Sequence, residues 1–336
     1  MRKDFALCLN DDYVPYACVA IKSIVSHIKH DDDVYIHLLS DYISEKHKRF
    51  IDKVSSGANI RIYTIDNQLY FASLPEQALS WSLYAWYRIL LPIVLDNTIC
   101  RVLYLDCDVL VNDSLDELFT MDMNGKSIAA CVDIETHTQS LYERLEYDSD
   151  LQYIYSGVIL MNLDKWRKDN LFEKIMAFVR ENPQKLRCPD QDAINYICRK
   201  DKVILSPKYG VIVPYFRYKW FLREHLTEID EMMNNPSIIH FAIYQPWIYQ
   251  RDKSMHSTLW WKTFNALNAF HYIRYNYIKS LIKYWLKVCF IKIGFIRKGS
   301  RHYICDMYYY HPRIKKKDIL ISLDRIRKED KTITLQ

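Results

Sequence analysis

The stretch Arg101–Asn112, RVLYLDCDVLVN, is an apolar run interrupted by two carboxylates, Asp106 and Asp108. The aliphatic and aromatic residues on both sides are typical of a buried strand. Residues two apart on a strand face the same side, so both acids are expected to point together and Cys107 to point away. Two carboxylates held this close stay ionised only beside a cation. The pattern therefore predicts a divalent metal, and a pair of strand-end acids facing solvent or an arginine is the alternative.

The segments around this stretch alternate between strand-like and helix-like patterns. Strands are expected over 4–9, 33–40, 59–65, 101–111, 127–134, 153–163, 202–213 and 236–244, and helices over 13–28, 44–56, 81–95, 171–182 and 190–200. Such alternation predicts an α/β fold with a mostly parallel sheet flanked by helices. Ligands bind such sheets at the carboxyl ends of the strands, where both 10–13 and 106–108 are expected.

The composition excludes several classes of protein. The chain has 336 residues, half of them hydrophobic, with only 6 Gly and 10 Pro, so a large core is expected and disorder is not. Nine cysteines without a CxxC pair indicate reduced thiols in a cytosol rather than disulfides or a zinc site. The N-terminus lacks the apolar core of a signal peptide. No GxGxxG motif indicates a dinucleotide site, and no nucleic-acid partner is expected.

Arg88 is the only charged residue between Glu76 and Asp96. The segment 77–95 around it is interpreted as a buried helix, because Pro92 and the arginine make it a poor membrane span. A buried guanidinium needs an anionic partner, such as Asp106, Asp190 or a ligand phosphate. The alternative is that the Arg88 side chain extends to the surface.

The C-terminal part is strongly basic. Residues 261–320 contain 13 Lys and Arg against two acids, and lysines recur every four or five residues from Lys279 to Lys292 among aromatic and aliphatic residues. This pattern predicts a helical tail lying in a membrane interface, with too much charge to cross the bilayer. The alternative is a helix packed on the body with solvated lysines.

Six segments resemble glycosyltransferase family 8, a family of retaining enzymes with the GT-A fold. LYLDCDVLV followed by SLDELF resembles the family's DxD strand. The other five follow in the family's order and together cover about residues 5 to 250: LNDDYVPYACVAIKSI, SLYAWYRILLP, SGVILMNLDKW, PDQDAIN and IIHFAIYQPW. The resemblance implies a Rossmann-like, mostly parallel sheet and transfer of a hexose from a UDP-sugar.

The resemblance also implies roles for individual residues. Asp106, Asp108 and His240 would bind Mn²⁺ or Mg²⁺ together with the diphosphate. Asp190 and Gln191 would lie at the anomeric carbon as catalytic residues, with Arg88 as a third. A covalent glycosyl-enzyme on a carboxylate and a same-face ion pair both remain open as the route to retention. Capping of the helix from Gln191 is the structural alternative for Asp190.

The donor nucleotide is expected at the first strand. The resemblance implies that Tyr13 stacks on uracil and that Asn10 and Asp12 contact the base and ribose. Turn and cap chemistry is the alternative for Asn10–Asp12. The remaining donor contacts would come from Arg88, Asp106, Cys107, Asp108, Ser156 and Gln245. Two departures from the family's pattern leave the hexose open: Tyr155 replaces the usual Asn, and the Gly and Lys that often precede Pro246–Trp247 are missing.

Residues 1–260 are therefore expected to form a GT-A catalytic domain, and 261–336 a basic, membrane-associating region. The expected activity moves glucose or galactose from a UDP-sugar to a lipid-linked acceptor, a lipopolysaccharide or another cell-surface glycan. The enzyme is expected in the cytoplasm, on the cytoplasmic face of the inner membrane. The alternatives are a haloacid-dehalogenase-like phosphatase that uses the DxD, and a non-enzymatic membrane-surface binding protein.

Overall fold

The computed structural model describes residues 1–133, 139–148, 150–212, 235–242, 245–247 and 255–267. The chain divides into two compact units, Met1–Ala242 and Ile243–Gln336. The predicted lysine-rich tail lies outside the described residues, so the predicted boundary at 260 and the membrane-associating role stay predictions. Within the described ranges no helix is long and apolar enough to cross a bilayer.

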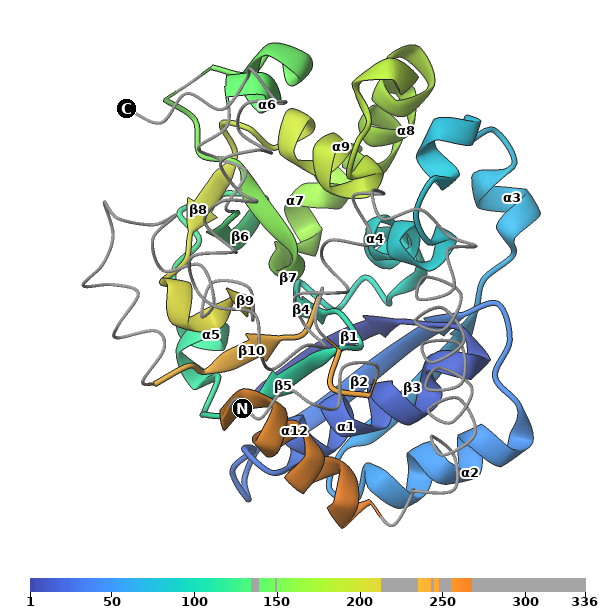
Figure 1. Ribbon diagram of the computed structural model, residues 1–336, viewed down its shortest axis with the longest axis vertical. Coiled ribbons are helices and arrows are strands. Elements are labelled where there is room, and N and C mark those ends of the chain that lie inside the picture. Colours follow the sequence, from blue (N-terminus) through green and yellow to red (C-terminus); the bar gives the residue numbers. More distant parts are fainter. Residues whose placement is uncertain (134–138, 149, 213–234, 243–244, 248–254, 268–336) are drawn as a thin grey trace, which may run out of the picture. The chain divides into compact units, whose positions relative to one another are not determined.

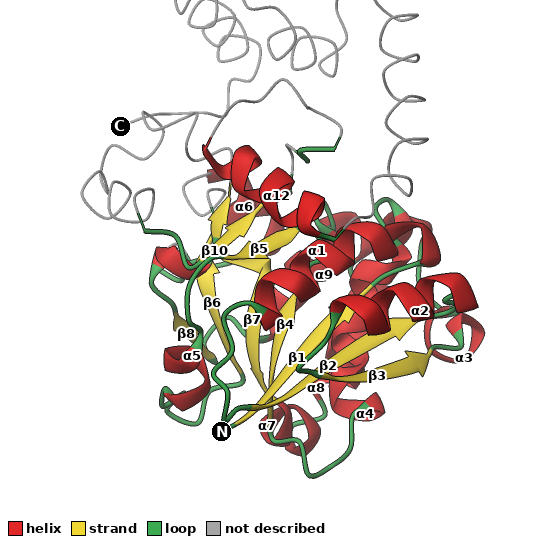
Figure 2. Cartoon of the chain, turned by 90° about the horizontal axis from the view of Figure 1, so that it is seen from below, coloured by secondary structure: helices red, strands yellow, loops and turns green. Residues whose placement is uncertain are grey.

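The first unit is built on a seven-stranded sheet in the order β3-β2-β1-β4-β7-β6-β8 (Figures 1 and 2). The bounds are β1 Arg2–Cys8, β2 Asp33–Ser40, β3 Asn59–Thr64, β4 Arg101–Leu105, β6 Ile128–Val132, β7 Ile154–Asn162 and β8 Lys202–Ile204. The pairs β1–β2, β2–β3, β1–β4 and β6–β8 are parallel, whereas β7 is antiparallel to both β4 and β6. The predicted mostly parallel α/β sheet is confirmed.

The predicted single strand over 101–111 is wrong, because it is two strands in two sheets. β4 ends at Leu105, and β5 (Val109–Val111) belongs to a three-stranded sheet in the order β5-β10-β9, with β10 at Ile238–His240 and β9 at Val211–Ile212. Asp106, Cys107 and Asp108 thus form the turn where the chain leaves one sheet and joins the other. The predicted strand over 202–213 is divided in the same way, between β8 and β9.

The predicted long helix over 81–95 is also wrong. The segment contains the 3₁₀ helix η3 (Leu83–Leu90) and the short α4 (Leu91–Val94), preceded by the 3₁₀ helix η2 (Glu76–Leu79). Pro92 has no N–H to donate to the Arg88 carbonyl four residues earlier, so a continuous α-helix cannot pass through it. The Leu91 N–H donates to that carbonyl instead, which closes a 3₁₀ turn.

Helices cover both faces of the large sheet (Figure 2). Their bounds are α1 Val14–Val25, α2 Glu45–Val54, α3 Asn67–Phe71, α5 Asp116–Thr120, α6 Gln139–Leu145, α7 Leu163–Lys168, α8 Leu171–Glu181 and α9 Pro189–Ile197. On one face, η3, α4, α7, α8 and α9 form a continuous core with Ala6, Val102 and Tyr104 of the strands. Packing of these helices on the strands fixes the strand ends at which the site is built.

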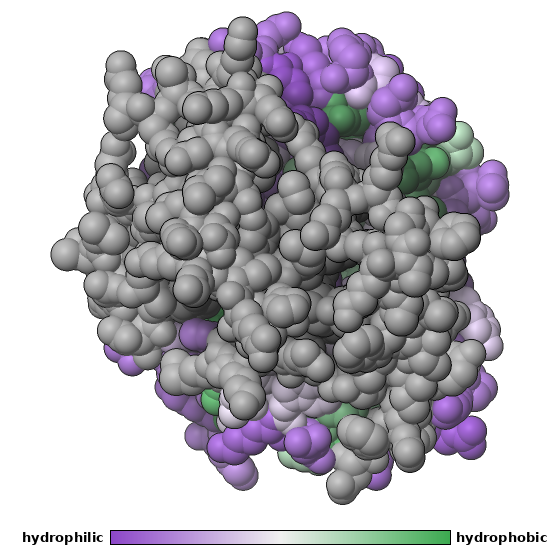
Figure 3. Space-filling view, viewed as in Figure 1, coloured by the Kyte–Doolittle hydropathy of each residue, from purple (hydrophilic) through white to green (hydrophobic). Residues whose placement is uncertain are grey.

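The visible described surface is mainly hydrophilic (Figure 3).

The second unit is described over a short aromatic cluster. Helix α12 (Met255–Ala266) carries Trp260, whose ring stacks on Phe264 at 5.3 Å between centroids and lies 5.0 Å from the ring of Trp247. Trp260 and Phe264 are fully buried. Aromatic side chains of this kind contribute apolar area and favourable ring contacts, so they stabilise this unit.

A buried lysine ties the first strand to α5. Lys3 is 2% exposed and forms ion pairs with Asp32 and Asp116, and Lys29 also pairs with Asp116. Hydrogen bonds from these two lysines lower the pKa of Asp116 from 3.8 to about 2. The carboxylate therefore stabilises the fold fully above pH 3.8, and this contribution is lost as the pH falls through 2.

We therefore expect Asp116→Asn to lower the free energy of unfolding at pH 7, by about 1 kcal/mol or less because the side chain is partly exposed. The difference from the wild type should shrink below pH 3.8 and vanish only as the pH falls below 2. Denaturant unfolding at a series of pH values measures it. Asp52→Asn, at an exposed position of α2, is the control and should change stability little at any pH. A deficit of undiminished size at pH 2 would contradict the ion-pair explanation.

Candidate active site

Asp106, Asp108 and His240 form a group that could hold a metal ion, and we call these three residues the metal-type group. Each offers one ligand atom, and these atoms lie within 4.8 Å of one another. His240 Nε2 donates a hydrogen bond to Asp108 Oδ1 at 2.6 Å and lies 3.8 Å from Asp106 Oδ2. His240 is 2% exposed and Asp108 9%. Two carboxylate oxygens and one imidazole nitrogen suit Mn²⁺ or Mg²⁺.

The register of the strands brings these three residues together. β10 pairs antiparallel with β5 so that His240 lies opposite Val109, the residue after Asp108. The Phe241 N–H donates to the Asp108 carbonyl at 2.9 Å. On the other side, the Asp106 N–H donates to the Gly157 carbonyl at 2.9 Å, which continues the β4–β7 pairing by one residue. The two acids converge through this turn rather than through the strand alternation that the sequence suggested.

The charges in the group compensate one another. Burial lowers the pKa of His240, but the Asp108 carboxylate, helped by Asp106, outweighs it and leaves that pKa above its ordinary value. The two carboxylates therefore favour the charged form of the imidazole, against the effect of its burial. His240 Nδ1 is buried and has no hydrogen-bond partner among the described residues.

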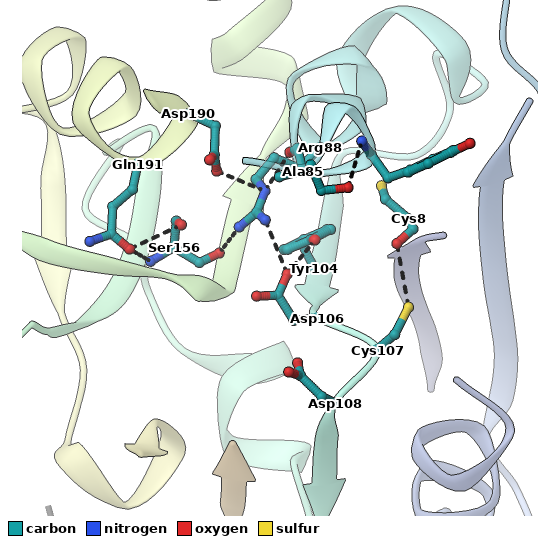
Figure 4. Close-up of polar contacts among 12 residues, drawn as sticks. Cys8, Ala85, Arg88, Tyr104, Asp106, Cys107, Asp108, Ser156, Asp190 and Gln191 are labelled. Atoms are coloured by element: carbon teal, nitrogen blue, oxygen red, sulfur yellow. Dashed lines mark hydrogen bonds and ion pairs between the residues drawn. The ribbon is translucent and has the colours of Figure 1, made fainter. Parts of the chain in front are cut away.

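Arg88 lies at the centre of a second charged group (Figure 4). The Nη2 atom donates to Asp106 Oδ1 at 3.1 Å, Nη1 donates to the Ser156 carbonyl, and Nε donates to the Ala85 carbonyl at 2.8 Å. Its guanidinium lies over the Tyr104 ring at 4.4 Å, and the Tyr104 hydroxyl donates to Asp106 Oδ1 at 2.5 Å. Arg88 is 4% exposed, so the predicted anionic partner is confirmed and extension to the surface is wrong.

Asp190 is the other acid beside Arg88. Its Oδ2 lies 3.3 Å from Arg88 Nε, but the Nε hydrogen points to Ala85, so this contact is an ion pair without a hydrogen bond. Burial raises the pKa of Asp190, although Arg88 acts in the opposite direction. Its Oδ2 has no hydrogen-bond partner among the described residues. A buried carboxylate oxygen left in this way can accept a hydrogen bond from a ligand hydroxyl.

The cap alternative for Asp190 is wrong. Helix α9 begins at Pro189, and its N-cap, Cys188, makes no side-chain cap bond. Asp192 Oδ2 accepts instead from the backbone N–H groups of Arg187 and Cys188, at 2.7 and 2.9 Å. Asp192 thereby satisfies free donors at the helix start, and Asp190 is left to face Arg88.

Gln191 and Ser156 are held by each other. Gln191 Oε1 accepts from the Ser156 N–H at 2.9 Å and from its hydroxyl at 3.1 Å, and Gln191 Nε2 donates to Asp133 Oδ2 at 3.1 Å. Asn195 fixes the same helix to β7, because its amide both accepts from the Ile154 N–H and donates to the Ile154 carbonyl, each at 2.7 Å. Sequence reasoning missed Asp133, Asn195 and Tyr104. Their hydrogen-bond partners cannot be identified before the packing of the strands is known.

The residues predicted for the nucleotide lie at the end of β1. Asn10 Oδ1 accepts from the Tyr13 N–H at 2.9 Å and caps the 3₁₀ helix η1 (Asp11–Tyr13), so the predicted cap chemistry is present. Burial and the nearby Asp108 carboxylate raise the pKa of Tyr13. Asp12 is exposed. Their contacts with a base and ribose stay predictions.

Cys107 and Gln245 were predicted to contact the donor as well. The Cys107 thiol donates to the Cys8 carbonyl at 3.4 Å, so it points away from the two acids, as predicted (Figure 4). Only the Cys107 backbone lies beside them. Gln245 belongs to the second unit, and its donor contact stays a prediction.

Tyr155 joins the metal-type group, which its sequence position did not indicate. Its hydroxyl oxygen lies 3.2 Å from His240 Nε2, and the two rings are 5.1 Å apart between centroids. Tyr155 and Gly157 face the same side of β7, and a Cβ at Gly157 would lie 2.0 Å from the Tyr155 hydroxyl. Only a glycine at 157 leaves room for this phenol.

Comparison with known proteins identifies the family of this chain. The sequence model of glycosyl transferase family 8 matches residues 4–251. General stress protein A of Bacillus subtilis (strain 168) is 27% identical over 254 residues, covering 72% of this chain and 87% of that protein. A lipopolysaccharide 1,2-glucosyltransferase of Escherichia coli is 27% identical over 246 residues, covering 71% of each.

The fold has solved relatives. The crystal structure of galactosyltransferase LgtC with donor and acceptor sugar analogs matches with a TM-score of 0.67 and 22% identity, covering 78% of this chain and 95% of that one. The shared fold is the predicted GT-A fold. The phosphatase and the non-enzymatic alternatives are therefore excluded. The match over 4–251 contains the metal-type group and Arg88 with all its contact residues. The chain therefore belongs to glycosyl transferase family 8 and is a glycosyltransferase.

Proposed function

We propose that this enzyme transfers a hexose, glucose or galactose, from a UDP-sugar to a saccharide acceptor with retention at the anomeric carbon, and that it requires Mn²⁺ or Mg²⁺. The convergence of Asp106, Asp108 and His240 carries the proposal. Retention is supported by the resemblance to family 8, and the nucleotide by the residues Asn10–Tyr13 beside this group.

Asp106, Asp108 and His240 Nε2 would hold the metal. When bound, the ion supplies Lewis-acid stabilisation of the departing nucleoside diphosphate. Arg88 keeps Asp106 in place through its hydrogen bond to Oδ1, which leaves Oδ2, the atom closer to His240, free to bind. His240 Nδ1 is buried and has no hydrogen-bond partner among the described residues. A bound ligand or a residue outside the described ranges would accept its hydrogen bond when Nε2 binds the metal.

Asp190 and Gln191 would bind the donor sugar. Asp190 Oδ2, which lacks a hydrogen-bond partner among the described residues, can accept from a sugar hydroxyl. The Arg88 guanidinium favours the charged carboxylate, against the burial that raises its pKa. The Gln191 amide is fixed by Ser156 and Asp133, so it presents a preset surface to the reacting sugar. Such fixed polar groups lower the reorganisation that the reaction requires.

The acceptor is proposed to be a lipid-linked saccharide, of lipopolysaccharide or of another cell-surface glycan. Two lipopolysaccharide 1,2-glucosyltransferases of Escherichia coli, 27% and 29% identical, support this class of acceptor. The basic, aromatic sequence 261–320 supports a position on the cytoplasmic face of the inner membrane, since each lysine near an anionic leaflet contributes about 1 kcal/mol.

Deleting residues 267–336 should therefore release the enzyme into the soluble fraction. The loss of most of the 13 basic residues of 261–320 removes the attraction to anionic lipid. Flotation with vesicles that contain anionic lipid measures it, and neutral vesicles are the control. Equal flotation of the shortened and full chains would contradict the membrane role without affecting the proposed transfer.

Titration with UDP tests the metal-dependent donor site. We expect UDP to bind in the presence of Mn²⁺ and to lose at least about tenfold in affinity when the metal is chelated, since a divalent ion offsets the charge of the diphosphate. Isothermal titration calorimetry measures this difference, and hydrolysis of a panel of UDP-sugars followed by NMR reports the hexose and the product anomer. Binding that is independent of metal would contradict the proposal.

A further inference from the structure

Tyr155 places a phenol beside the nitrogen proposed to ligate the metal. Its hydroxyl oxygen is 3.2 Å from His240 Nε2, and Tyr155 is 7% exposed. The absence of a side chain at Gly157 makes room for the ring, since a Cβ there would meet the Tyr155 hydroxyl at 2.0 Å and His240 Cε1 at 2.7 Å. The phenol is therefore held in a defined position within the group.

Counting hydrogens at His240 Nε2 shows that the phenol has a spare donor. Asp108 Oδ1 lies 2.6 Å from Nε2, and a carboxylate cannot donate, so Nε2 carries its one hydrogen toward Asp108. A nitrogen that carries a hydrogen cannot accept one from Tyr155. A nitrogen bound to a metal has also used its lone pair. In both states the Tyr155 O–H must donate elsewhere, and among the described residues His240 is its only hydrogen-bond partner.

A diphosphate bound beside Asp106, Asp108 and His240 needs hydrogen-bond donors that offset its charge. Arg88 uses three of its five N–H hydrogens on the protein, one from each guanidinium nitrogen. From His240 to Trp247 the sequence, HFAIYQPW, contains no lysine or arginine. A preset hydroxyl close to the metal ligands can stabilise the charge that develops on the leaving group.

We propose that Tyr155 is a further catalytic residue, whose hydroxyl donates a hydrogen bond to a diphosphate oxygen of the donor beside Asp106, Asp108 and His240. This inference rests on the proposed nucleotide-sugar donor. The hydrogen bond to the charged diphosphate strengthens as the sugar leaves, and the phenol keeps its proton throughout.

Tyr155→Phe tests the proposal, because it keeps the ring over Gly157 and removes only the hydroxyl. In the presence of Mn²⁺ we expect UDP to bind about tenfold more weakly than to the wild type, as for one hydrogen bond to a charged group. Uridine, which lacks the diphosphate, should bind equally to both. The value of kcat/KM for transfer from the UDP-sugar should fall about 10- to 100-fold. Calorimetry with UDP and with uridine separates a diphosphate contact from a loss of packing.

Tyr153→Phe is the matched control. The Tyr153 hydroxyl is also buried and donates to Asp192 Oδ1 at 2.8 Å, away from the metal-type group. This variant should keep the wild-type ratio of UDP to uridine affinity. Unchanged UDP binding by folded Tyr155→Phe, or equal losses for UDP and uridine, would overturn the role of Tyr155. Absence of metal-dependent UDP binding in the wild type would instead overturn the proposed function itself.

Discussion

Asp108→Asn is expected to reduce sugar transfer by at least about 10³-fold and to leave the fold intact, because charge stabilisation by a metal contributes several kcal/mol to such reactions. The amide has the shape of the carboxylate, and its oxygen can still accept the hydrogen bond from His240 Nε2 that Asp108 accepts at 2.6 Å. It carries no negative charge, so the metal would lose one of the two anionic ligands that offset its charge.

Turnover of the UDP-sugar in the presence of Mn²⁺, together with circular dichroism and thermal unfolding, measures the effect. Asp113→Asn changes an exposed acid only five residues further along the chain and should leave transfer unchanged. A folded Asp108→Asn enzyme with wild-type turnover would show that the two acids and His240 do not hold a metal needed for transfer.

Arg88→Met should have the second large effect, on both stability and transfer. Without the guanidinium, Asp106 and Asp190 remain near each other with no cation from this side chain between them, and the Ser156 carbonyl loses its donor. Removing one member of a buried ion pair typically costs about 3–5 kcal/mol of stability. We expect a loss of this size and transfer too slow to measure.

Arg88→Lys separates charge from geometry. A single ammonium keeps the charge but cannot reach the Ala85 and Ser156 carbonyls and Asp106 together, so stability should be intermediate and transfer about 10²-fold slower, as when one preset donor is lost. Arg101→Lys is the control, since among the described residues the Arg101 guanidinium donates to the Phe119 and Met121 carbonyls. Chemical denaturation and kcat measure both effects. Wild-type transfer by Arg88→Lys would show that the guanidinium's shape is not required.

The sequence predicts the large sheet well, because its strands are local runs of apolar residues between amphipathic helices. It fails at Leu105, where the run continues but the chain changes sheets. The chain changes sheets because β5 pairs with β10. Residues Ile238–His240 of β10 lie much further along the chain than a window of local sequence pattern can reach. Local periodicity contains no information on such a partner.

The sequence also predicts part of the site and misses the residues whose contacts depend on a distant strand. The resemblance to the family located Asp106, Asp108, His240, Arg88, Asp190 and Gln191, all of which the structure places in two adjoining charged groups. Asn195 could not be recognised, because its task is to bond both backbone groups of Ile154 on a strand 41 positions earlier. Tyr155 was visible only as an unusual residue, since its contact with His240 depends on the space above Gly157.

The turn at Asp106–Asp108 joins two sheets, and the acids on its two sides belong to different ones. Asp106 follows β4 of the seven-stranded sheet, whereas Asp108 precedes β5 of the three-stranded sheet, in which His240 also lies. An ion chelated there would act as a non-covalent cross-link between the sheets. Loading with Mn²⁺ should then raise the melting temperature and delay hydrogen–deuterium exchange in Ile238–His240, a short strand that is otherwise secured by few backbone pairs.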